Sequence, residues 1–273
     1  MRTFNSDFLW CALLLLSLIL LHISRRKTKI VNLNNRIFRD IVVIGLLDVV
    51  FELASNGFIA RCADSICIGA VITTHVFFLF QALLPFSLLC YIRVLIENRR
   101  LSAREMLLMG APALSLAFII LTNPFTDALF YFDARGYQHG PLYYALYVSA
   151  ALHLLTALIL TISCRRTLGK DRTLALIETF VLAVSGVICQ ALHPQVLTTG
   201  FGMSLSILAM FTTINNPQAN TDSLTGLHDK QFLLRRVDEM LAQKKPFHVL
   251  TVYLYSLSYV NKAYGMQGGD AML

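Results

Sequence analysis

Charged residues are scarce in this sequence. Asp, Glu, Lys and Arg make up 14% of its 273 residues, whereas they make up about a quarter of a soluble globular domain. Hydrophobic residues make up 56%. Because so few charges cannot cover the surface of a water-soluble fold of this size, the composition excludes a soluble globule for most of the chain.

Cysteines are few and carry no metal-binding pattern. None of the six has the paired spacing that holds zinc. Four lie in or beside apolar runs, where a free thiol behaves as a small hydrophobe. Cys62 and Cys67 lie in a short connection instead. Both a disulfide and two free thiols remain open for that pair.

A signal-peptide cleavage site is also missing. The first apolar run, 8–24, is followed by RRKTK and by no small-x-small motif, so we expect an uncleaved anchor. Further runs of about 20 residues are each long enough to cross a bilayer: 40–60, 68–92, 105–122, 141–163, 173–192 and 196–214. The predicted fold class is mainly α, with a polytopic bundle of seven transmembrane helices over residues 1–214 in a lipid bilayer.

Basic residues predict the orientation of this bundle. The connections after the first, third and fifth runs hold 14 Lys and Arg, whereas the opposite side holds only Arg2, Arg61 and Arg135. Because positive charge stays inside, we expect a multi-pass protein of the cell membrane with an extracytoplasmic N-terminus and a cytoplasmic C-terminus. The basic residues flank apolar runs, so we expect no nucleic-acid partner.

Several polar residues lie within the apolar runs. Asp48 and Glu52 are four residues apart and therefore share one face of a helix. Ionisable groups in lipid are costly, and we expect this pair to face the bundle interior. Two interpretations stay open for it: a ligand-binding or proton-linked site, or hydrogen bonds between helices. For the other polar residues we favour interhelical hydrogen bonds: His75, His153, Glu178 and Gln190.

Two motifs flank the longest connection on the extracytoplasmic side, LTNP at 121–124 and HGPLYY at 139–144. Together with the seven runs, they resemble the N-terminal seven-helix sensor module of bacterial histidine kinases and cyclic-di-GMP enzymes. The His that often follows the Asn-Pro is replaced here by Phe125 and Thr126. The resemblance implies an extracytoplasmic ligand, whose identity the sequence does not indicate.

The composition changes after residue 214. Residues 215–221 form a predicted linker without heptads, in which Pro217 discourages continuation of the last helix. Apolar spacing predicts a helix over Lys230–Gln243. The β-branched and aromatic run His248–Leu257 predicts a strand, and Lys262–Leu273 a turn leading into a second helix. The expectation is a short cytoplasmic α/β fragment.

This region resembles the opening third of a GGDEF (diguanylate cyclase) domain, covering residues 222–273. The resemblance is carried by DSLTGL and by an N-x-x-x-G-x-x-x-G-D pattern that includes Asp222, Leu224, Thr225, Gly226, Leu227, Asn261, Gly265, Gly269, Asp270 and Leu273. It implies a palm-like domain that acts as a dimer on two GTP molecules with Mg²⁺. By position, Asn261 and Asp270 match the residues that bind the guanine edge.

The sequence departs from an active member of this family. Tyr253 stands where the family places its first metal-binding Asp, and a phenol is a poor substitute for a carboxylate ligand of Mg²⁺. The sequence also stops at Leu273, before the hairpin that would carry the signature loop. We therefore expect a degenerate, truncated and inactive domain that retains neither GTP nor Mg²⁺. Such a chain would act as a homodimer or by pairing with an intact GGDEF protein.

Two alternatives remain open. The chain is a fragment of a longer active cyclase, or it is a small-molecule or proton-linked transporter in which Asp48 and Glu52 carry the charge. Inverted repeats or paired broken helices would favour the transporter, and the sequence has neither.

Overall fold

A computed structural model describes residues 5–25, 33–61, 68–133, 136–193, 196–214, 224–225, 227, 230–242, 246–253 and 257–270. The chain divides into two compact units, Met1–Asn215 and Asn216–Leu273, each of which is described by itself. The predicted linker, 215–221, lies outside the described residues.

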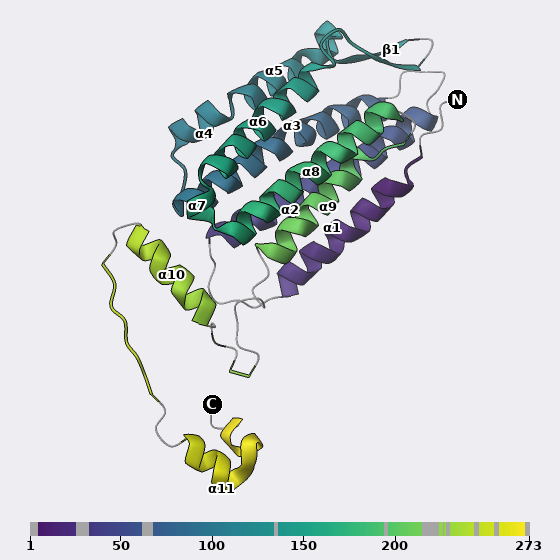
Figure 1. Ribbon diagram of the computed structural model, residues 1–273. Helices are drawn as coiled ribbons and strands as arrows, with labels where there is room; N and C mark the ends of the chain where they lie inside the picture. The colour runs from purple at the N-terminus through teal and green to yellow at the C-terminus, as the bar shows by residue number, and fades with distance from the viewer. Residues whose placement is uncertain are drawn as a thin grey trace. The chain divides into compact units, whose positions relative to one another are not determined.

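In the described part of the first unit, a helix covers each of the predicted apolar runs (Figure 1). A short turn, α7 (Arg165–Leu168), precedes α8. The other described helices of this unit are α1 (Asp7–Arg25), α2 (Leu33–Arg61), α3 (Ile68–Glu97), α4 (Ala103–Met109), α5 (Ala111–Thr126), α6 (Ala145–Ser163), α8 (Lys170–Leu192) and α9 (Thr199–Thr213).

Four of these helices are long and apolar enough to cross a membrane, namely α1, α3, α6 and α8 over Lys170–Gln190. The helices α4 and α5 meet at a bend of 67°, and together they would form a fifth span if both belong to one membrane crossing. Gly110 lies at this bend, where an added Cβ would be 2.8 Å from the Met106 carbonyl oxygen. The helices α2 and α9 lie in the same bundle, and α2 packs mainly on α3.

Small residues bring α8 and α9 close together. A Cβ added to Gly202 would lie 2.9 Å from the Cα of Gly186, so the two backbones touch where neither residue has a side chain. Ser206 Oγ also donates to the Thr179 carbonyl across this interface at 2.9 Å. Close packing through small residues is how apolar helices associate where no hydrophobic force drives them together.

A two-stranded hairpin closes one end of the bundle, here named the hairpin end (Figure 1). Its strands β1 (Phe130–Asp133) and β2 (Gly136–His139) are antiparallel, with Phe130 opposite His139. Asn123 is buried near the end of α5. Its side-chain oxygen accepts a hydrogen bond from the N–H of Leu129, which directly precedes β1, and so attaches the hairpin to α5. The helix α5 extends past the end of the predicted run 105–122, to Thr126, and is followed by Asp127 with φ 50°.

The second unit contains two described helices, α10 (Lys230–Ala242) and α11 (Leu257–Asp270). The first agrees with the predicted helix. The predicted strand is wrong for its described part: residues 248–253 have no strand partner among the described residues. A lone strand leaves its backbone groups unpaired, so high β-propensity alone does not form one. The second helix starts earlier than predicted, and Gly265 breaks it with φ 74°.

Candidate functional site

The pair Asp48 and Glu52 lies on the buried face of α2, with 5% and 4% of each residue exposed. This is the interior position predicted from the cost of charge in lipid. Glu52 reaches α9, because a Cβ added to Gly200 would lie 3.1 Å from Glu52 Oε2. Glycine at position 200 therefore makes room for the carboxylate between α2 and α9.

Other polar atoms in the bundle are buried without hydrogen-bond partners among the described residues. They include Asp48 Oδ1, His75 Nε2 and His153 Nε2. Both histidines use Nδ1 to contact a carbonyl one turn earlier in their own helix, at 2.7 Å, so neither makes the expected interhelical hydrogen bond through that nitrogen. Buried polar atoms are normally satisfied, and such exceptions in a membrane bundle point to a functional interior.

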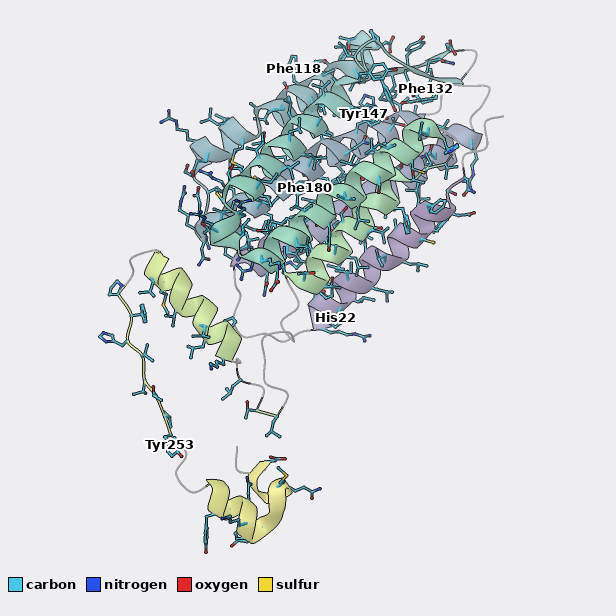
Figure 2. The ribbon with its side chains drawn as sticks, viewed as in Figure 1. His22, Phe118, Phe132, Tyr147, Phe180 and Tyr253 are labelled. Carbon is cyan, nitrogen blue, oxygen red and sulfur yellow. The ribbon has the colours of Figure 1, made fainter. Side chains whose placement is uncertain are left out.

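An aromatic cluster, here named the aromatic cap, covers the hairpin end of the bundle. It consists of Phe130, Phe132, Tyr137, His139, Tyr143 and Tyr147. Figure 2 labels Phe132 on the hairpin and Tyr147 on the adjoining helix α6. The rings of His139 and Tyr143 are stacked, with centroids 3.7 Å apart and an 8° angle between planes. The cap is therefore a packed layer joining the hairpin to the start of α6.

The cap is joined to the polar interior through Phe130 of β1. This ring packs edge-on against His75 of α3, with ring centroids 4.8 Å apart. His75 therefore lies between the cap and the buried polar atoms of the bundle.

Two other predicted polar residues have different environments. Gln190 Oε1 accepts from the backbone N–H groups of Thr198 and Thr199, both at 2.9 Å, and so caps the start of α9. This agrees with the predicted structural role between helices. Glu178 is exposed on α8, so it does not take part in the interior hydrogen bonds that we expected for it.

The residues of the second unit that carry the family resemblance are only partly described. Asp222 and Gly226 lie outside the described residues, while Leu224 and Leu227 are exposed and Thr225 accepts from the Leu227 N–H at 3.3 Å. Asn261 and Asp270 lie in α11 on either side of the break at Gly265. Asp270 is exposed, whereas Asn261 Oδ1 is buried without a described partner. Gly269 belongs to the same helix as Asp270.

Neither unit has an evident metal centre in its described part: no group of three or more His, Cys, Asp or Glu side chains is placed to hold an ion. Tyr253, at the family's metal position, is 81% exposed. Cys62 and Cys67 lie outside the described residues, so both a disulfide and two free thiols stay open for this pair. The other four cysteines are free.

No protein-family model and no curated protein matches this chain.

The structure adds two functional features that the sequence reasoning missed. The first is the edge-on contact of Phe130 with His75, which no spacing in the sequence indicates. The second is the role of Asn123, whose side chain bonds the hairpin backbone. An Asn-Pro followed by aromatic residues was a visible signal for the second, but the bonded partners lie six and seven residues further along the chain.

Proposed function

We propose that this chain is a seven-span membrane sensor of the GGDEF signalling class, with a catalytically inactive cytoplasmic region. The single observation that supports the sensor is the burial of Asp48 and Glu52 inside the bundle. A carboxylate pair inside an apolar bundle stabilises a positive charge brought near it. The signal that fits is therefore a proton or a small cation arriving from the hairpin end.

The proposed topology has α2 and α9 crossing the membrane together with the other five segments. The helix α2 has 29 residues, or about 43 Å at 1.5 Å per residue, which exceeds a hydrocarbon thickness of about 30 Å. The helix α9 has 15 residues and packs against α8 and α1. The distribution of 14 basic residues against 3 supports a cytoplasmic C-terminus.

The proposed output class depends on the resemblance of residues 222–273 to a GGDEF domain. In that assignment Asn261 and Asp270 occupy the positions at which active members bind the guanine edge, whose donors and acceptors suit amide and carboxylate groups. Tyr253 supplies no carboxylate for Mg²⁺, so the region retains neither Mg²⁺ nor GTP and acts by pairing. Its partner is a second copy of the chain or an intact GGDEF protein.

The proposed sensor is tested by measuring thiol labelling of the second unit while the charge of Asp48 and Glu52 is changed. A single cysteine at the exposed Leu234 of α10, in a chain whose native cysteines are replaced by serine, reports the reactivity of the second unit in proteoliposomes. Acidifying the hairpin side should change its labelling rate. Asp48→Asn with Glu52→Gln should abolish that change, whereas Glu178→Gln, which alters an exposed acid on α8, should preserve it.

A change in labelling rate that persists in the double variant would show that Asp48 and Glu52 do not sense the signal.

The same proteoliposomes also test the transporter alternative, which the partnerless Asp48 Oδ1 favours. Sustained proton or cation flux that depends on Asp48 would establish the transporter and contradict the sensor. Against it, α4 and α5 are the bent pair found among the described helices, with no counterpart in the other half of the bundle.

A further inference from the structure

A groove of about 360 Å³ lies on the side of the bundle far from the aromatic cap, between α2, α3 and the start of α4. Most of its described lining is aliphatic or aromatic, including Ile37, Ile44, Leu83 and Phe86. Leu83 is 38% exposed, so the groove opens on the outer surface of the helices. An apolar groove on that surface faces lipid when the bundle is in a bilayer.

The groove crosses the predicted boundary of the membrane. Its lining runs from Leu33 to Ile44 along α2 and from Leu83 to Val94 along α3. Each stretch of 11 residue steps is about 16 Å long at 1.5 Å per residue. The predicted apolar runs begin at residue 40 on α2 and end at residue 92 on α3, so the lining beyond them lies at the level of the lipid headgroups. The groove therefore fits the headgroup end of a single acyl chain inserted from the near surface.

The mouth of the groove carries an uncompensated positive charge. Its described polar lining consists of Asp40, Ser87 and Arg100. Asp40 is already in contact with Arg39, at 3.5 Å. Arg100 is exposed and has no ion pair with any carboxylate that the structure describes. The excess charge at the mouth therefore comes from Arg100.

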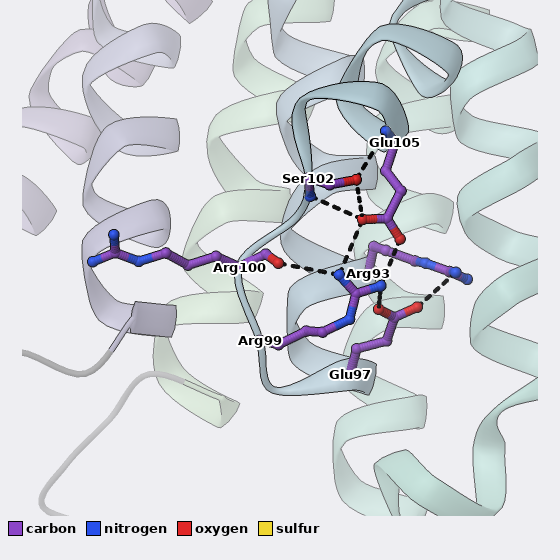
Figure 3. Close-up of polar contacts among 6 residues, drawn as sticks. All are labelled: Arg93, Glu97, Arg99, Arg100, Ser102 and Glu105. Atoms are coloured by element: carbon purple, nitrogen blue, oxygen red, sulfur yellow. Dashed lines mark hydrogen bonds and ion pairs between the residues drawn. The ribbon is translucent and has the colours of Figure 1, made fainter.

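The backbone around Arg100 is held in place by its neighbours (Figure 3). Arg99 donates to Glu105 Oε2 at 3.0 Å and to the Arg100 carbonyl at 3.2 Å, and it also pairs with Glu97. Ser102 caps α4 in a reciprocal arrangement with Glu105. The hydrogen bond to Glu105 is the main reason that the pKa of Arg99 is raised. Figure 3 shows the Arg100 side chain directed away from this network.

We propose that the groove holds one acyl chain of an anionic phospholipid and that Arg100 binds its headgroup phosphate. The leaflet follows from the proposed topology, in which this end of the bundle is cytoplasmic. Basic pockets between helices on the cytoplasmic side suit anionic headgroups, and burial of the acyl chain adds to the charge interaction. The connection 98–102 between α3 and α4 is already held in place, so Arg100 can bind the phosphate without further ordering of its backbone.

The test uses the purified full chain and native mass spectrometry in detergent, with phosphatidylglycerol and phosphatidylcholine of identical acyl chains. Wild type should retain phosphatidylglycerol in preference to phosphatidylcholine. Arg100→Gln should weaken phosphatidylglycerol retention about fivefold, the factor expected for one basic residue near an anionic headgroup. Arg104→Gln, which removes an exposed arginine outside the groove lining, should leave retention unchanged.

The acyl chain is tested separately. Leu83→Trp should fill the groove and reduce retention of both lipids, while Leu155→Trp, at a residue of α6 that is 56% exposed, should not. Equal retention of the two lipids by wild type, or unchanged retention in Arg100→Gln or Leu83→Trp, overturns the proposal. Lipid retention in detergent is independent of orientation, so a reversed topology would change the leaflet and leave these results as they are.

Discussion

The side chain of Asn123 forms a reciprocal pair of hydrogen bonds with the backbone of Phe130. Its Nδ2 donates to the Phe130 carbonyl at 3.0 Å, and its Oδ1 accepts from the Phe130 N–H at 3.3 Å. The same Oδ1 accepts from the Leu129 N–H at 2.6 Å. One buried amide thus satisfies three backbone groups and attaches the aromatic cap to α5.

Replacement of Asn123 by alanine should therefore destabilise the hairpin end. Each buried backbone group left without a partner costs about 1–3 kcal/mol, so the loss of three predicts a decrease of at least about 3 kcal/mol in the free energy of unfolding. Thermal unfolding in detergent is the measurement. Thr122→Ala is the matched control, because that hydroxyl bonds only carbonyls of its own helix. An unchanged midpoint for Asn123→Ala would contradict the role given to this residue.

The contact between α8 and α9 predicts a second change in stability. In Gly202→Ala the new methyl group would lie 2.9 Å from both the Gly186 Cα and the Leu182 carbonyl oxygen, so the helices must separate. Overpacking of this kind costs about 1–3 kcal/mol. Gly57→Ala serves as the control, since nothing lies within 4 Å of its added Cβ. Equal unfolding midpoints for the two variants would show that the helices part without cost.

The proposed topology predicts opposite labelling at the two ends of the bundle. In a chain whose native cysteines are replaced by serine, a membrane-impermeant thiol reagent applied to intact cells should modify Asp133→Cys in β1. It should leave Lys170→Cys at the start of α8 unmodified until the membrane is permeabilised. If Lys170→Cys were labelled in intact cells and Asp133→Cys were not, the orientation would be the opposite of the one proposed.

The cytoplasmic region predicts an absence of cyclase activity. Purified chain with GTP and Mg²⁺ should yield no cyclic di-GMP by liquid chromatography, since loss of a metal ligand removes charge stabilisation from phosphoryl transfer. Tyr253→Asp should not restore activity, because residues 246–253 have no described strand partner to position the new carboxylate. An authentic active cyclase is the positive control. Product from either form of the chain would defeat the assignment.

Local sequence patterns predicted where helices form, although four or five of the described helices, and not the predicted seven, have the length and composition to cross a membrane. The helix predicted over Lys230–Gln243 is found over Lys230–Ala242, and a helix covers each apolar run of the first unit. Apolar length and helical spacing depend on neighbours within a few residues, and so they can be interpreted without the fold. The same reasoning placed Asp48 and Glu52 on an interior face, because four-residue spacing and the cost of charge in lipid leave few alternatives.

Strand formation depended on the tertiary structure. The run His248–Leu257 has the composition of a strand, yet its described part has no partner, because a strand exists only when a second segment supplies hydrogen bonds. The weakly marked FYFD segment did become β1, since GYQH folds back on it. Propensity describes one segment, whereas pairing requires two.

The candidate site shows the same division. The sequence alone determined that two carboxylates lie one helical turn apart in an apolar run and that aromatic residues cluster after an Asn-Pro. Only the tertiary structure decided that Gly200 makes room for Glu52 and that Phe130 packs on His75. These pairs lie on different elements and are separated by many residues along the chain. Their proximity is set by how the helices pack, which spacing within one helix does not encode.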